Sequence, residues 1–254
     1  MLSQLLQLDI FRFMLIFTRI GTAMMLLPGI GGQLVSLRIR LWLGLSISFL
    51  LLPVLAGLLP QLPSTIGGML LLVFGEAMVG MFMGTIISLI MSTLGLAGTM
   101  IGYQTGLTNA FSFDPIAQQQ NQLLTGFLSN IGMIAIFVTD LHHLMFESII
   151  DSYGLFRPGQ PLPLGDFAET LSHLITETFR VGLQFSAPLV VFGLIFYTGL
   201  GLLSRLVPSI QVFFISTPVQ VVVGLWMFSA SLPLLISLFL QFFENSLLPY
   251  TGTR

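Results

Sequence analysis

Cysteine and lysine are both missing from this 254-residue sequence, and charge of either sign is scarce. Without cysteine, the chain has no disulfide framework, no thiol nucleophile and no thiolate zinc site. Only 7% of its residues are charged, against about 25% in a typical soluble domain. All the basic residues are arginines and the net charge is −2, so nothing in the sequence predicts a nucleic-acid partner.

Motifs for catalysis are missing as well. The sequence has no G-x-S-x-G nucleophile turn, no G-x-x-x-x-G-K-[ST] phosphate loop, no H-E-x-x-H zinc motif and no paired-aspartate membrane-protease motif. We therefore expect a protein that is not an enzyme and that has no cofactor and no metal site.

Apolar residues are abundant instead: they make up 55% of the chain, and the mean hydropathy is +0.98. The apolar runs are continuous and do not alternate as membrane-barrel strands do, and many exceed the roughly 20 residues that a spanning helix needs. The sequence predicts an all-α, polytopic membrane protein with long kinked helices that form hairpins. Helices are expected at residues 9–27, 39–59, 66–100, 121–150, 167–204 and 210–246.

Charges and prolines refine this prediction. The first segment carries Asp9, Arg12 and Arg19 without a basic start, which favours a retained helix over a cleaved signal peptide. Asp166 is a candidate N-cap. Pro218 and Pro233 lie in the last apolar run, which is therefore expected to be one kinked helix or a hairpin of two.

One polar stretch interrupts the apolar runs, at residues 100–122 (MIGYQTGLTNAFSFDPIAQQQNQ). It holds one charge, Asp114, which is too few for an ordinary surface loop. Irregular backbone at membrane depth survives only where it is buried in protein or faces water. Two interpretations remain open: an ordinary re-entrant loop, or a loop whose Phe111 and Phe113 occlude a narrow passage.

Small residues recur every fourth position in the third predicted helix, at Gly80, Gly84, Ser88 and Ser92. Residues four apart share a helix face, and small side chains there let a second helix approach closely. The partner helix can belong to this chain or to a neighbouring subunit, and the spacing does not distinguish the two.

Isolated ionisable residues form the last group of candidates. Arg19 and Glu76 lie in apolar runs, where a charge must be paired or solvated; a role in coupling ions to transport is the functional alternative. Asp140, His143 and Glu147 are spaced for one helix face, which suits a metal site or a proton relay. The simpler interpretation is that they mark where a helix leaves the apolar layer.

The order of these landmarks resembles the bacterial FliR family of flagellar export-gate proteins, which is shared with the SctT proteins of injectisomes. The resemblance covers nearly the whole chain, and its most specific part is residues 201–224. It is carried by Arg19 followed by Pro28, Arg38 and Arg40 before Pro53, Gly75-Glu76 with Gly80, residues 102–115 with Phe-x-Asp-Pro, residues 140–144, Ser186-x-Pro188, and GLLSRLVPSIQVFFISTPVQVVVG at residues 201–224.

The resemblance implies a subunit of a type III export gate in the bacterial inner membrane, at the flagellar basal body. Expected partners are FliP-like and FliQ-like subunits, FlhB-like and FlhA-like proteins, exported unfolded flagellar proteins and membrane lipid, with no nucleic acid. The fold would be one membrane domain, with a FliP-like part at residues 1–204 and a FliQ-like hairpin at residues 205–254. The pore plug would comprise Tyr103, Gly106, Phe111, Phe113, Asp114 and Pro115.

Two alternatives to a flagellar gate remain. An injectisome gate subunit of the same family would share these motifs. A secondary transporter of a small solute would depend on Glu76 or Asp140 and would show two related halves, but the sequence has no convincing internal repeat.

Overall fold

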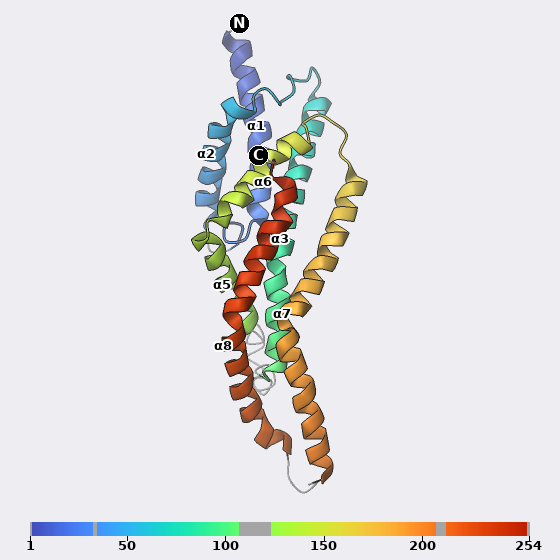
Figure 1. The fold of residues 1–254 in the computed structure, drawn as a ribbon. Coiled ribbons are helices and arrows are strands. Elements are labelled where there is room, and N and C mark those ends of the chain that lie inside the picture. Colours follow the sequence, from blue (N-terminus) through green and yellow to red (C-terminus); the bar gives the residue numbers. More distant parts are fainter. Residues whose placement is uncertain (1, 33–34, 107–122, 207–211, 253–254) are drawn as a thin grey trace. The chain divides into compact units, whose positions relative to one another are not determined.

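The computed structural model describes residues 2–32, 35–106, 123–206 and 212–252. Within these ranges the backbone forms α-helices and one short 3-10 helix, and no strand, so the predicted all-α class is confirmed (Figure 1). The elements are α1 (Leu2–Leu26), α2 (Leu37–Leu55), α3 (Ile66–Gln104), α5 (Leu123–Val138), α6 (Leu141–Leu155), α7 (Leu164–Leu206), α8 (Val212–Leu247) and η3 (Leu248–Tyr250).

One predicted helix differs from the structure, and one open alternative is decided by it. The helix expected at residues 121–150 is broken at Thr139 and Asp140, and Asp140 adopts a left-handed backbone with φ 60°. The last apolar run is a single helix, α8, which continues through Pro218 and Pro233. A proline removes one helical hydrogen bond, but apolar surroundings strongly favour keeping all the remaining backbone groups hydrogen-bonded within the helix. This explains why a membrane helix tolerates proline.

Helix ends differ less. α3 continues to Gln104, four residues beyond the predicted end, and therefore includes Gly102. α7 begins at Leu164, so Asp166 lies inside the first turn and is not the N-cap. An acidic residue there still favours the helix, because the first turn carries the positive end of the helix dipole.

The chain divides into two compact units, and α3, α7 and α8 contribute residues to both. Unit 1 comprises Met1–Ile90, Phe137–Leu174 and Phe243–Arg254. Unit 2 comprises Met91–Ile136 and Ile175–Phe242. The predicted division at residue 204 follows sequence likeness to two subunit types and stays a prediction.

In unit 1, α1 packs closely against α2 and against the first half of α3. A side chain at Gly80 would overlap the main-chain oxygen of Arg19 and the hydroxyl of Thr22, and one at Gly84 would meet the main chain of Ala23. The absence of side chains at these two positions is what allows α1 and α3 to approach. Leu15 and Ile16 of α1, and Met83 and Ile86 of α3, are fully buried.

In unit 2, the end of α3 packs against α5 in the same manner. A side chain at Gly98 would meet the main chain of Leu124 and Thr125. Directly beside this contact, the hydroxyls of Thr99 and Thr125 are 3.1 Å apart and share a hydrogen bond.

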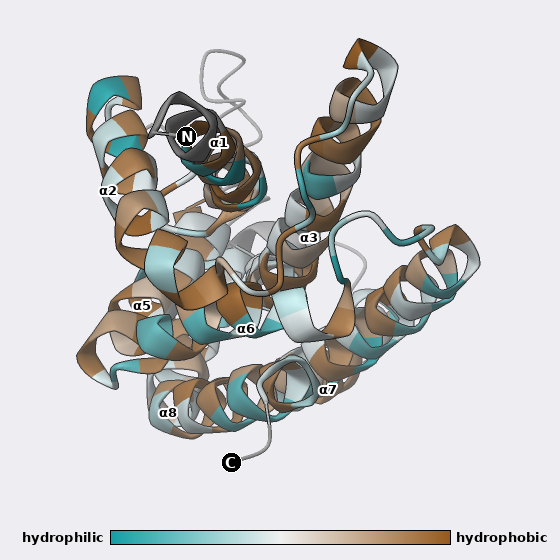
Figure 2. Cartoon of the chain, turned by 90° about the horizontal axis from the view of Figure 1, so that it is seen from above, coloured by the Kyte–Doolittle hydropathy of each residue, from teal (hydrophilic) through white to brown (hydrophobic). Residues whose placement is uncertain are grey.

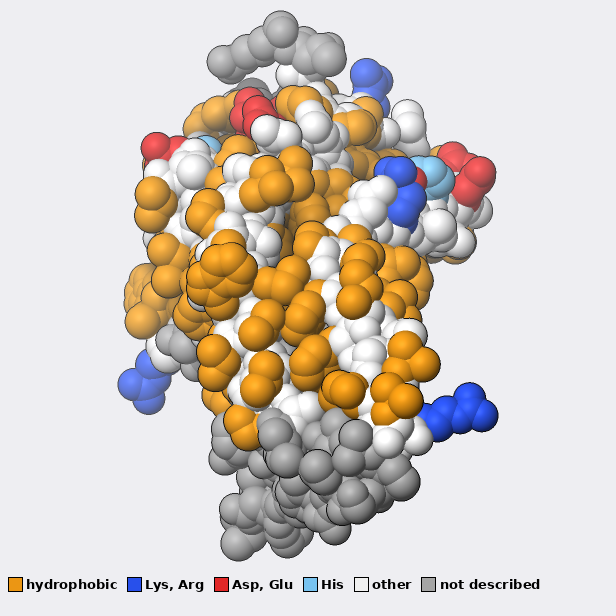
Figure 3. Space-filling model, turned by 60° about the horizontal axis from the view of Figure 1, so that its bottom comes forward, with side chains coloured by type: hydrophobic (Ala, Val, Ile, Leu, Met, Phe, Trp, Pro, Cys, Tyr) orange, Lys and Arg blue, Asp and Glu red, His pale blue; other side chains and the backbone are white. Residues whose placement is uncertain are grey.

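Hydrophobic residues occur along the length of the helices (Figure 2) and dominate the visible surface in Figure 3. Among the described residues, four helical segments are long and apolar enough to cross a membrane, and the α5–α6 pair would add a fifth if it forms one broken span. The four are Leu37–Leu55, Ile66–Gln104, Leu164–Leu206 and Ser216–Tyr250. The chain is therefore a multi-pass membrane protein.

Candidate functional site

A buried ion pair joins α1 to α3 in the interior of unit 1. Arg19 Nε donates to Glu76 Oε2 at 2.7 Å, and Arg19 Nη2 donates to Glu76 Oε1 at 3.0 Å. The two side chains are only 1% and 3% exposed. This is the two-pronged geometry in which a guanidinium matches a carboxylate, and it satisfies both oxygens of Glu76.

The same guanidinium also binds α6. Arg19 Nη1 donates to the Ser152 hydroxyl at 3.1 Å, and Nη2 donates to the Phe156 carbonyl at 2.8 Å. The guanidinium carbon lies 3.8 Å from the centre of the Tyr153 ring, in position for a cation–π interaction. Because Phe156 is the C-cap of α6, the arginine also neutralises the negative end of that helix dipole.

An aromatic cluster continues from Phe156 to α7. The rings of Phe82 and Phe167 stack with centres 3.9 Å apart, and Phe156 lies edge-on to both. A pocket of about 210 Å³ borders the cluster and the ion pair, and the segment that joins α6 to α7 forms one of its walls. Arg157 and Gln160 of that segment are exposed there.

These contacts define what the ion pair does. Two charges taken out of water are costly unless they bond to each other and to further polar groups. Here the guanidinium uses donors on all three of its nitrogens within one site. The arrangement holds α1, α3 and α6 in register, and it leaves the carboxylate of Glu76 bonded on both oxygens to Arg19.

A second polar site, built without charge, lies at the end of α3 in unit 2. Gln220 of α8 is buried, and its amide nitrogen donates to the main-chain oxygen of Gln104 and to the Tyr197 hydroxyl, both at 3.0 Å. The last carbonyls of a helix have no partner within the helix. Gln220 therefore caps α3 from the side and connects it to α7 through Tyr197.

Close approach at glycines completes this second site. A side chain at Gly193 of α7 would overlap the Gln104 side chain, and one at Gly224 of α8 would meet the Cα of Thr105. Gly106, with φ +72°, lies against the Gln220 amide. Gln104 ends α3, and Thr105 and Gly106 form the turn that follows it. These three residues are thus held by α7 and α8.

Comparison with known proteins places the chain in a family. The model of the bacterial export proteins, family 1, matches residues 10–246. The flagellar biosynthetic protein FliR of Caulobacter vibrioides is 35% identical over 218 residues, which is 86% of this chain and 87% of that protein.

The chain belongs to the FliR family. The FliR of Aquifex aeolicus is 28% identical over 228 residues, covering 87% of this chain and 85% of that protein. The FliR of Bacillus subtilis is 29% identical over 158 residues, which is 61% of each chain. Both buried sites lie within the residues that the FliR family model matches.

Part of the predicted FliR-family plug lies outside the described residues: Phe111, Phe113, Asp114 and Pro115. The two other plug candidates are described. Tyr103 is exposed on the last turn of α3, and Gly106 contacts Gln220. The structure therefore shows how the segment begins.

The ladder of small residues has two parts. Gly80 and Gly84 are buried against α1, so this part of the ladder packs within the chain. Ser88 and Ser92 are exposed, and a contact of these two serines with a neighbouring subunit stays a prediction.

Several residues of these sites were missed by sequence analysis. Ser152 and Tyr153 carry no motif, and Gln220 lies in the run of residues 201–224 without a role of its own. Each of the three contacts a partner more than 100 residues away in the chain. Gln220 had one available signal: it is the only amide side chain between Val212 and Leu240 in a continuously apolar run. A lone polar residue there needs a buried partner.

Proposed function

We propose that this FliR-family chain is a core channel subunit of the flagellar type III export gate in the bacterial inner membrane. It assembles with FliP-like and FliQ-like subunits, next to FlhB-like and FlhA-like proteins, and unfolded flagellar proteins pass through the assembly. The observation that carries the proposal is the family match over residues 10–246. All three relatives compared above are named flagellar, which favours a flagellar gate over an injectisome gate.

The exposed apolar surface supports a subunit of a larger membrane assembly. In the most apolar windows of α2, α7 and α8, only 11%, 22% and 17% of residues are buried within the chain. Exposed Trp42 and Trp226 stand on two of these helices. Lipid and neighbouring subunits would both cover such surfaces, since monomeric soluble proteins rarely expose large apolar patches.

The plug assignment forms part of the proposal. Tyr103, Gly106, Phe111, Phe113, Asp114 and Pro115 would close the pore before export begins. The described end of α3 supports this placement, because Gln220, Gly193 and Gly224 hold the residues from which the segment starts.

Deletion and replacement in the bacterium that carries the gene test the proposal. Loss of the chain should abolish export of flagellin and swimming while growth continues, and the wild-type gene should restore both. Replacing Phe111 and Phe113 with alanine should preserve assembly but let ions leak, measured as a fall in membrane potential. Normal swimming without the chain would refute the gate assignment, and a sealed, fully assembled double variant would refute the plug alone.

The secondary-transporter alternative makes the opposite prediction. It requires solute uptake by the purified chain alone in vesicles, and a loss of uptake on Glu76→Gln. The bonding of both Glu76 oxygens to Arg19 supports a structural role for this carboxylate over an ion-coupling role.

A further inference from the structure

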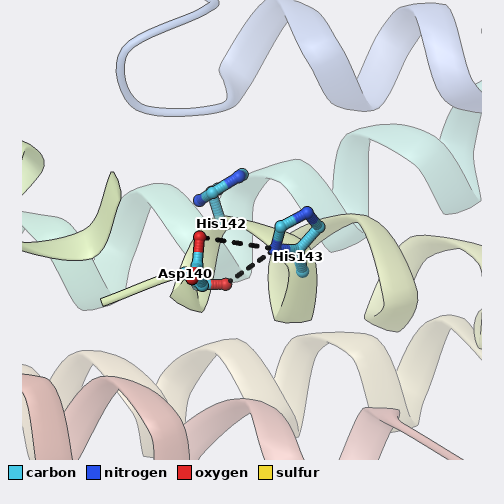
Figure 4. Close-up of side chains that lie close together, drawn as sticks. All are labelled: Asp140, His142 and His143. Carbon is cyan, nitrogen blue, oxygen red and sulfur yellow. Dashed lines mark hydrogen bonds and ion pairs between the residues drawn. The ribbon is translucent and has the colours of Figure 1, made fainter. Parts of the chain in front are cut away.

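Three side chains with metal-binding groups meet at the start of α6. Asp140, His142 and His143 each place one ligand atom within 4.8 Å of the others, as Figure 4 shows. All three belong to unit 1. Sequence analysis had grouped Asp140 with His143 and Glu147 on one helix face, but Asp140 precedes the helix, so helical spacing does not apply to it.

The local backbone holds these groups together. Asp140 has a left-handed conformation, its main-chain oxygen accepts from His143 N at 3.0 Å, and its Oδ1 lies 3.9 Å from His143 Nδ1. The His142 ring stacks on the Phe137 ring, with centres 5.0 Å apart. The two imidazole rings lie side by side, with centres 4.1 Å apart.

One ring nitrogen in this cluster lacks a partner. Nδ1 of His142 is buried, and no hydrogen bond reaches it from the part of the chain that the structure describes. Buried polar side-chain atoms are satisfied in the large majority of cases, so an exception needs an explanation. A cation bound through Nδ1 would give this nitrogen a partner and would fix the orientation and tautomer of the His142 ring.

We propose that Asp140, His142 and His143 bind one divalent first-row transition metal ion, with Zn²⁺ as the occupant. Two imidazoles and one carboxylate are donors that zinc, nickel and copper accept, whereas calcium and magnesium require mostly oxygen ligands. Three protein ligands leave a fourth position for water. The ion would fix residues 137–143, where α5 ends and α6 begins.

The geometry requires only a small adjustment. Ligand atoms at about 2.1 Å from a tetrahedral ion lie about 3.4 Å apart. Because the observed atoms lie within 4.8 Å of one another, the widest pair must close by at most about 1.4 Å. The side chains of Asp140 and His143 are 79% and 73% exposed, so they have room to rotate toward an ion. His143 must first give up the contact of its Nδ1 with the Asp140 main-chain oxygen at 3.2 Å. The more enclosed His142, held against Phe137, is the fixed member of the set.

Titration of Zn²⁺ into the detergent-purified chain and its co-purifying subunits tests the proposal. The preparation should use a tag without histidine and a prior chelator wash, and calorimetry should report the affinity. We expect one site per chain that is weakened at least about tenfold by His143→Ala and by Asp140→Asn, a loss comparable to that seen for residues that support metal ligands. Excess Mg²⁺ should not compete, and Co²⁺ in the same site should show the visible absorption of a nitrogen-ligated ion.

Two variants keep the test interpretable. His142→Phe preserves the ring that stacks on Phe137 but removes both nitrogens, so it should fold normally and lose the site. His173→Ala removes the only other histidine, on the exposed face of α7, and should bind Zn²⁺ as the wild type does. Equal Zn²⁺ affinity in wild type, His142→Phe and His143→Ala would overturn the proposal, and so would a wild type that binds no Zn²⁺. Both results are independent of whether the gate exports protein.

Discussion

Two buried polar sites of the described residues, one in each unit, differ in their chemistry. Unit 1 pairs full charges, Arg19 with Glu76, whereas unit 2 uses the neutral amide of Gln220. The charged site engages helix side chains and a helix end deep among packed apolar residues. The neutral site engages the end of α3, within the polar stretch of residues 100–122.

The difference shows how the chain distributes its few polar groups. A broken buried ion pair leaves an uncompensated charge, which is far more costly than one lost neutral hydrogen bond. The charged site is therefore the more costly of the two to separate. The neutral site, at the end of α3, is expected to separate at lower cost.

The largest expected effect follows from removing one charge. Glu76→Ala or Arg19→Ala should lower the free energy of unfolding by about 3–5 kcal/mol, because the remaining charge stays buried and unpaired. Arg19→Lys should also be destabilising, since lysine can neither bond in two prongs nor stack on Tyr153 as arginine does. Thermal unfolding of the purified complex and the yield of folded chain measure both effects.

A double substitution separates the charge from its burial. Arg19→Met with Glu76→Leu should lose less stability than either alanine variant, because no charge then remains in the apolar interior. If each single variant is as stable as the wild type, the ion pair is not what holds unit 1 together.

An intermediate effect is expected at Gly80. Gly80→Ala places a methyl group against the main chain of Arg19 and should lower stability by about 1–3 kcal/mol, since the helices must separate. Gly75→Ala, on the same helix, meets nothing within 4 Å and should be neutral or stabilise by up to about 1 kcal/mol. Unfolding temperatures of the two variants compare close helix packing with ordinary helix propensity.

At the neutral site, Gln220→Ala should lower the free energy of unfolding by about 1–3 kcal/mol, because the Gln104 carbonyl loses its cap. The loss should be smaller than that of Glu76→Ala, and hydrogen exchange should rise at the end of α3. Tyr197→Phe, which removes one partner of the same amide, should cost about 1 kcal/mol. A Gln220→Ala loss equal to that of Glu76→Ala would remove the contrast between the two sites.

The smallest effect is expected for the exposed ion pair of α7. Arg180 Nη2 lies 2.6 Å from Glu177 Oε2, but the two side chains are 61% and 29% exposed. Glu177→Gln should therefore change stability by at most about 1 kcal/mol. Comparing the stability losses of Glu177→Gln and Glu76→Gln shows whether the burial of an ion pair, and not its mere presence, determines the loss of stability.

Sequence patterns predicted the helices where apolar runs are long, because spanning length and continuity are local properties. They missed the break between α5 and α6, since neither Thr139 nor Asp140 is a strong helix breaker. They also left open a hairpin within the last run, where α8 continues through Pro218 and Pro233. Such outcomes depend on the packing of distant segments, which a local pattern does not encode.

The same limit applies to the site residues: a local sequence feature indicates some of them, but not the long-range contacts that they make. Arg19 and Glu76 stood out in sequence because a charge in an apolar run demands a partner. Their pairing spans 57 residues of chain. The contacts of Ser152 and Tyr153 with Arg19, and of Gln220 with Gln104, each span more than 100. Only the folded arrangement of the helices brings these groups together.

The most direct test of the central claim is the mass of the intact complex after purification from its own bacterium in mild detergent. The account predicts an assembly that contains this chain with FliP-like and FliQ-like subunits, and whose mass far exceeds the 27.8 kDa of the chain. A stable particle with the mass of a single chain, in a detergent that keeps other membrane complexes whole, would contradict it.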